Sequence, residues 1–128
     1  MKALTAVVTE LMASSHVTAG DVKTLGLASQ VDGLVAVDKA GQVLRPAIIW
    51  MDRRAEAQCA GLASRISKEQ IFQITGLNLD SSHVVPKALW LSENQPEIFR
   101  AMKRALLPDA YIVQWLQGEA VVDHSNLS

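Results

Sequence analysis

A predicted hairpin between residues 34 and 49 sets the first limit on the fold of this chain. Residues 34–37 and 43–49 are two apolar, strand-like segments, and residues 38–41 form a turn between them. Gly41 supplies the glycine that such short connections often need. Pro46 has no backbone N–H to donate, so the second arm is predicted to be an edge strand.

Helices and one buried strand are predicted around this hairpin. Leu4, Val7 and Leu11 recur at helical spacing near the N-terminus, so the first helix is amphipathic. Residues 22–29 combine apolar and small residues and predict a buried central strand. The rest of the pattern predicts further helices over 52–67 and 68–74, from Pro86, over 96–102, and from Pro108 to Gly118. It also predicts a loop over 77–85, a short strand over 105–107 and an extended tail over 119–128.

These elements predict an α/β fold in which the sheet is too small. Three or four strands are predicted, of which only residues 22–29 have the pattern of a central strand, and so small a sheet cannot cover the helices around it. The sequence therefore has the character of part of a larger fold.

Composition limits the classes of partner. The chain has 128 residues, enough for one modest core, and 12 basic residues against 13 acidic ones give a formal charge of -1. This balance disfavours nucleic acid and anionic membranes as partners, and no apolar run reaches the ~20 residues that span a bilayer. The lone Cys59 cannot form an internal disulfide, so a reducing, cytoplasmic setting is expected.

Asp32 is the first candidate site residue. It follows the predicted strand 22–29 directly, and ligands of α/β folds bind beyond the carboxyl ends of strands. A carboxylate there can accept hydrogen bonds from ligand hydroxyls. The alternative is that Asp32 begins a turn that leads into the hairpin.

The other end of the hairpin carries a second candidate group, at residues 50–54. Trp50 offers an aromatic face that can stack on the apolar face of a sugar, and a carboxylate and two guanidinium groups follow at Asp52, Arg53 and Arg54. In the alternative interpretation Asp52 caps the next helix, the arginines are surface charge and Trp50 belongs to the core.

Several common catalytic patterns are missing from the sequence. His83 has no second ligand at metal-binding spacing, so a metal site is not expected. Ser81 and Ser82 are not part of a G-x-S-x-G motif, and neither glycine-rich phosphate loop, G-x-x-x-x-G-K-[ST] or G-x-G-x-x-G, occurs.

Three blocks of the sequence, taken in order, resemble the FGGY family of carbohydrate kinases. They are "GLASQVDGLVAVDKAGQVLRPAIIWMDRRAEAQ", "ITGLNLDSSHVVPKALWLSENQPEIF" and "ALLPDAYIVQWLQGEAVVDHSNLS". The likeness is to the xylulokinase-like branch and extends over nearly all of residues 3–128. It implies two ribonuclease-H-like α/β domains, related to actin and hexokinase, that transfer the ATP γ-phosphate to a sugar or polyol hydroxyl with Mg²⁺.

The resemblance also implies which residues contact the substrate. The family's sugar-contacting pair falls on Val31 and Asp32, where xylulokinases typically have Met-His and glycerol kinases Arg-Glu. The W-x-D-x-R segment falls on residues 50–54, which implies that Trp50 lines the pocket. An aromatic pocket residue of glycerol kinases corresponds to Ser82. The expected substrate-binding residues are Val31, Asp32, Trp50, Asp52, Arg53 and Ser82.

By the same resemblance, the phosphate-binding D-x-G-T/S hairpin, the general base and the adenosine-binding domain lie outside this chain. We therefore expect a fragment of the N-terminal kinase domain, over residues 1–128, with no catalytic residue of its own and little affinity for ATP or Mg²⁺. The alternative is a non-catalytic product that self-associates through exposed apolar surface and binds a polyol weakly or not at all.

Overall fold

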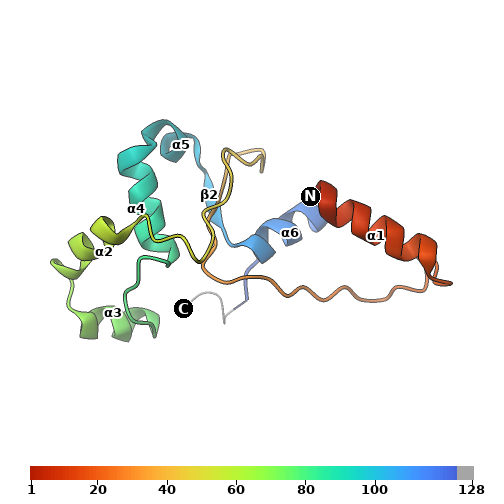
Figure 1. Ribbon diagram of the computed structural model, residues 1–128, viewed down its shortest axis with the longest axis horizontal. Helices are drawn as coiled ribbons and strands as arrows, with labels where there is room; N and C mark the ends of the chain where they lie inside the picture. Colours follow the sequence, from red (N-terminus) through yellow and green to blue (C-terminus); the bar gives the residue numbers. More distant parts are fainter. Residues whose placement is uncertain (124–128) are drawn as a thin grey trace.

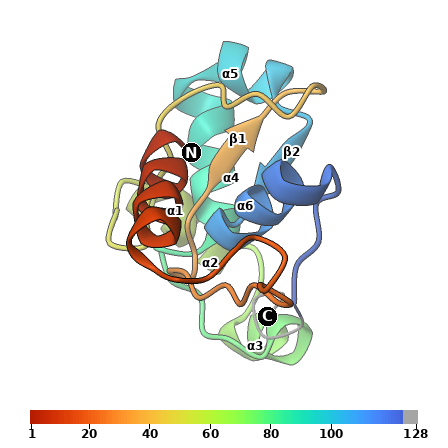
Figure 2. The same cartoon turned by 90° about the vertical axis from the view of Figure 1, so that its right-hand side faces the viewer.

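A computed structural model describes residues 1–123, and a two-stranded antiparallel sheet lies at its centre. Strand β1 (Val35–Val37) pairs with β2 (Arg104–Leu106), and Val35 faces Leu106 in the register. Figure 2 shows the two strands side by side among the helices. The fold is therefore mixed α/β, and the small sheet that the sequence predicts is confirmed for the described residues.

Strand β1 is buried on both faces and divides the core into two clusters. Side chains alternate along a strand, so Ala36 points to one face while Val35 and Val37 point to the other. One cluster joins Ala36 and its neighbour Leu34 to residues of α4 (Val84–Asn94) and α5 (Pro96–Ala101). The other joins Val35 and Val37 to β2 and α6 (Pro108–Gln117). Helices thus cover both faces of the sheet.

The predicted hairpin turn is confirmed, but its second arm is not a continuous strand. The Asp38 N–H donates to the Gln42 carbonyl at 3.0 Å, and Gly41 has a φ of 78°, which suits glycine. Beyond the turn, the arms are joined by two isolated bridges, Leu34 to Ile48 and Val37 to Val43. Pro46 lies between the bridged residues of the second arm and cannot donate to a ladder.

Most of the predicted helices are confirmed, with adjusted ends. Helix α3 (Lys68–Thr75) begins with a capping box between Ser67 and Gln70, and Gly76 ends it in the left-handed region. Gly118 ends α6 in the same way. The loop after α3 is shorter than predicted because α4 already begins at Val84. The first helix is α1 (Lys2–Ser14).

Helix α2 (Glu56–Ala63) corrects the predicted role of Asp52 as a helix cap. The N-cap is Ala55, three residues further on, and no side chain caps the helix. Asp52 instead accepts a hydrogen bond from the Arg54 backbone N–H at 3.0 Å, which forms a turn ahead of the helix.

The predicted central strand at residues 22–29 is wrong. This segment runs from α1 toward the hairpin as an extended stretch, drawn in orange in Figure 1. Val22 and Leu25 are 50% and 62% exposed, as is usual for polar rather than apolar side chains. A strand needs a second strand to satisfy its backbone groups, and no described segment of residues 1–123 pairs with it.

None of the helices within residues 1–123 has the length and apolar character that crossing a bilayer requires.

The core position of Leu91 gives a test of this fold. Leu91 is fully buried in the cluster on the α4 side of β1. We expect Leu91→Ala to lower the free energy of unfolding by about 2–5 kcal/mol, because it removes buried methyl groups and leaves a cavity. Urea denaturation measures the change. Leu116→Ala, at a half-exposed position of α6, is the matched control and should cost less than about 1 kcal/mol. Equal losses would contradict the packing described.

Candidate functional site

The two ends of the hairpin lie beside each other. Leu34 and Ile48 exchange backbone hydrogen bonds of 2.8 and 3.0 Å. Just beyond this pair, the Gln30 side-chain oxygen accepts a hydrogen bond from the Trp50 N–H at 3.5 Å. The segment that carries Val31 and Asp32 is thereby tied to the segment that begins at Trp50.

Asp32 has an unusual backbone conformation at this end of the hairpin. Its φ is 55°, and no other non-glycine residue in residues 1–123 has a positive φ. Asp is among the side chains that tolerate the left-handed region, at some energetic cost. The Asp32 carboxylate accepts no hydrogen bond from the described protein groups and lines a cavity. It is therefore available to a ligand.

A buried lysine, which our sequence analysis did not single out, holds Asp32. Lys87 lies in the first turn of α4, is fully buried, and donates a hydrogen bond from its Nζ to the Asp32 carbonyl oxygen. Burial lowers the pKa of Lys87, while the carboxylates of Asp32, Asp52 and Asp80 act in the opposite direction. Its spacing from Val84 and Leu91 places it on the inward face of α4, a signal that was present in the sequence.

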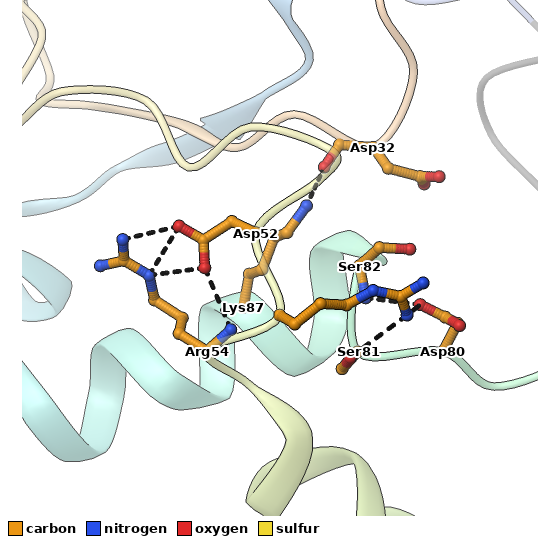
Figure 3. Close-up of polar contacts among 8 residues, drawn as sticks. Asp32, Asp52, Arg54, Asp80, Ser81, Ser82 and Lys87 are labelled. Atoms are coloured by element: carbon orange, nitrogen blue, oxygen red, sulfur yellow. Dashed lines mark hydrogen bonds and ion pairs between the residues drawn. The ribbon is translucent and has the colours of Figure 1, made fainter.

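Asp52 and Arg54 form a compact ion pair that is anchored to α4. The Arg54 guanidinium donates to both Asp52 carboxylate oxygens, from Nε at 2.8 and 2.9 Å and from Nη2 at 2.6 Å. It also lies over the Trp90 ring, 4.7 Å from the centroid. These hydrogen bonds hold the pKa of Asp52 below its usual value. Arg54 is thus committed to Asp52 and Trp90, as Figure 3 shows for the ion pair.

Arg53 connects the hairpin segment to the loop that carries Ser82. Its guanidinium forms an ion pair with Asp80 and lies 3.5 Å from the Ser81 hydroxyl oxygen. The Ser82 N–H donates to the same Asp80 carboxylate at 2.8 Å. These donors hold the pKa of Asp80 well below its usual range, with Arg53 as the largest cause. Figure 3 shows Asp80, Ser81 and Ser82 of this loop together.

Val31 and Trp50 are both exposed, at 55% and 50%. The interpretation of Trp50 as a core residue is therefore wrong, and its aromatic face is accessible. The structure brings residues 30 and 50 together at one end of the hairpin, and Asp32, Asp52 and Asp80 all act on Lys87. Of the six expected substrate-binding residues, Asp32, Asp52 and Arg53 therefore lie near Lys87, and Asp52 and Arg53 are already engaged in ion pairs.

A cavity of about 480 Å³ lies next to Asp32. Its walls come from α3, the loop before α4, the start of α6 and residues 120–122, and most of the lining side chains are aliphatic. His83 lines it together with Asp32, whereas Trp50 does not. The cavity therefore has an apolar interior with a carboxylate among its few polar groups.

No metal site is formed by the described residues, because nowhere in residues 1–123 do three His, Cys, Asp or Glu side chains gather closely enough to hold an ion. Cys59 is partly buried, and burial raises the pKa of its thiol. A raised pKa leaves less of the reactive thiolate, so the structure adds no support for a reactive role.

The comparisons with known proteins point to one family. The model of the FGGY family of carbohydrate kinases, N-terminal domain, matches residues 1–128. A xylulose kinase from Escherichia coli is 39% identical over 106 residues, which is 83% of this chain and 22% of that protein. A glycerol kinase from Acinetobacter baylyi is 43% identical over 90 residues, which is 70% of this chain and 18% of that protein.

Solved structures agree with these sequence matches. The xylulose kinase from Rhodospirillum rubrum superposes with a TM-score of 0.81 at 29% identity, over 92% of this chain and 25% of that one. A gluconate kinase from Lactobacillus acidophilus shares the fold, with a TM-score of 0.86 at 22% identity, over 98% of this chain and 25% of that one. The chain thus spans about a quarter or less of the length of each of these relatives.

The Arg53–Asp80 pair predicts how stability depends on pH. The pKa of Asp80 is lower in the folded chain than in the unfolded chain, where it is about 3.9. Its contribution to the free energy of unfolding is therefore complete above that value and is lost as the pH falls below it. We expect Asp80→Asn to be slightly less stable than wild type near pH 6, with the difference shrinking below pH ~4.

Urea denaturation at a series of pH values measures this difference. The effect should be small because both side chains of the pair are largely exposed and solvent screens them. Glu97→Gln removes an exposed carboxylate elsewhere, on α5, and serves as the control. A difference between wild type and Asp80→Asn that does not change with pH would argue against the ion pair.

Proposed function

Because the chain belongs to the FGGY family of carbohydrate kinases, we propose that it is the sugar-binding portion of the N-terminal domain of such a kinase. In this proposal, residues 1–128 are a fragment of a ribonuclease-H-like domain, and the whole enzyme transfers the ATP γ-phosphate to a pentulose or polyol hydroxyl. The observation that carries the proposal is the half-buried Asp32 carboxylate at the end of the hairpin, which accepts no hydrogen bond within residues 1–123, in a chain that the family model matches over 1–128.

The chemistry of the hairpin end suits a polyhydroxylated ligand. A carboxylate without a protein donor can accept hydrogen bonds from one or two sugar hydroxyls, and such bonds to a charged group are among the stronger ones. The exposed Trp50 ring can cover the apolar face of a sugar. The Arg53–Asp80 ion pair fixes the loop at Ser82, where a small side chain leaves space for the ligand.

The sugar class follows from the named relatives. Xylulose kinases and glycerol kinases both match this chain, so a ketopentose and a small polyol are the two kinds of substrate to consider. Val31 and Asp32 differ from the Met-His pair typical of xylulokinases and the Arg-Glu pair typical of glycerol kinases. We therefore propose the broader class, a pentulose or polyol.

We further propose that the isolated chain transfers no phosphate. The chain matches about a quarter of the length of its relatives. The family resemblance assigns the general base and the ATP phosphate loop to the part of the relatives that it does not match. ATP and Mg²⁺ belong to the proposal for the whole enzyme, where they would supply and stabilise the transferred phosphoryl group. The residues described here would bind and orient the acceptor sugar.

Calorimetric titration of D-xylulose, D-ribulose and glycerol tests the proposed site. We expect at least one of these ligands to bind wild type, and Asp32→Ala to bind it at least tenfold more weakly, because the substitution removes a charged acceptor. Glu97→Ala, on the exposed side of α5, should bind like wild type. If none of the ligands binds, the proposed function fails; a coupled ADP-release assay checks separately that the chain alone has no turnover.

The second candidate function, a non-catalytic chain that folds by self-association, is favoured by the exposed apolar surface. Val22, Leu25 and Leu11 are each at least half exposed, and α1 buries none of its residues. Apolar side chains that are exposed to solvent favour association with a second apolar surface, which covers them.

Sedimentation velocity tests this second candidate. We expect wild type to form dimers or larger species at micromolar concentration, and Leu25→Glu to shift the distribution toward monomer, because a charge opposes burial of the exposed segment. The exposed residue Lys23 lies in the same segment, and Lys23→Glu is the matched charge control. A wild-type chain that sediments as one monomeric species would rule out self-association.

A further inference from the structure

The buried ammonium of Lys87 makes its only hydrogen bond within residues 1–123 to a main-chain oxygen of the candidate site. The group has three donors, and the bond it makes is to the Asp32 carbonyl. Figure 3 shows that carbonyl turned toward Lys87 and the Asp32 carboxylate turned away from it. The lysine therefore contacts the backbone of Asp32 and leaves its carboxylate open to a ligand.

Filling the core does not require a lysine at this position. A buried charge must be compensated by partners, and an apolar residue of similar volume is often as good for stability. Here the compensation comes from the Asp32 carbonyl and from three carboxylates, Asp32, Asp52 and Asp80, that belong to three different segments. The position of the ammonium is thus defined by the residues around the candidate site.

The backbone of Asp32 needs such a partner. Its φ of 55° is a conformation that side chains with a Cβ adopt at a cost, and Gly33 follows it directly. A hydrogen bond from Lys87 to its carbonyl oxygen favours the orientation of this peptide over the alternatives in which the carbonyl turns to solvent. Without that bond no hydrogen bond of the described residues 1–123 holds the Asp32 main chain, so the segment that carries the carboxylate is free to shift.

We propose that Lys87 is a positioning residue: it holds the Asp32 peptide in its left-handed conformation and so directs the Asp32 carboxylate toward the bound sugar. The part of this inference that concerns sugar binding rests on the proposed function. Its structural part, the dependence of the Asp32 conformation on Lys87, holds for the chain without any ligand.

A double-mutant comparison of Lys87→Met, Asp32→Ala and the combined variant tests the proposal. With D-xylulose, D-ribulose or glycerol as the titrated ligand, we expect Lys87→Met to weaken binding at least tenfold. The combined variant should bind no more weakly than Asp32→Ala alone, because Lys87 acts through Asp32. Lys103→Met makes the same change at an exposed lysine and should bind like wild type.

A purely structural role for Lys87 would give a different result. In that case Lys87→Met would change the free energy of unfolding and leave affinity unchanged, or its loss of affinity would add to that of Asp32→Ala. Either outcome would overturn the proposal. If circular dichroism shows that Lys87→Met is unfolded, Lys87→Leu, which also lacks a donor, takes its place, with the same expected loss and the same criteria.

A measurement without ligand separates this inference from the proposed function. The one-bond Cα–Hα coupling of Asp32, measured by NMR, distinguishes a positive from a negative φ. We expect a positive φ in wild type and Lys103→Met, and its loss in Lys87→Met or Lys87→Leu. If wild type binds none of the three ligands, the proposed function fails, and the NMR result alone decides whether Lys87 controls Asp32. A positive φ that persists without the lysine would refute the inference.

Discussion

The burial of β1 on both faces is the constraint on which the rest of this structure depends. Three residues, Val35–Val37, contribute side chains to two separate clusters, and helices from opposite sides pack against them. A strand that is buried on both sides cannot carry polar residues in either direction, which explains its uninterrupted apolar sequence. The polar groups of the hairpin consequently lie outside β1, in the turn, in the second arm and at the two ends where the candidate site lies.

The ion pairs near the site connect elements that the small core does not. Arg54, held by Asp52 of the same segment, contacts Trp90 of α4, and Arg53 joins the segment to the loop that precedes α4. An exposed pair such as Arg53–Asp80 contributes little stability on its own. Together the two pairs fix the relative positions of residues 52, 53 and 80. Their main effect is therefore on the geometry of the candidate site rather than on the stability of the fold.

Local chemistry explains which parts could be predicted from the sequence. The Asp38 turn and the glycines that end α3 and α6 depend on hydrogen bonds within a few residues, and the sequence analysis predicted them from short patterns or breaks. The Ser67 capping box is equally local but was not predicted. The helix start at Asp52 was wrong because an Asp can form either a cap or a turn, and here the Arg54 N–H satisfies it before the helix begins. Lys87 was not singled out, since lysines are rarely fully buried, although its spacing matches the buried face of α4.

Long-range pairing explains the remaining error and has a consequence for folding. A pattern such as that of residues 22–29 shows that a segment is able to form a strand. Whether it does so depends on pairing with a second segment, which is often far away in the sequence. The one sheet of the described chain illustrates this distance, since Val35 pairs with Leu106 across about 70 positions. Helices α4 and α5 can form and pack on each other locally, but the chain must close this long loop before β1 is buried. The region around Asp32 is therefore expected to acquire its final geometry among the last steps of folding.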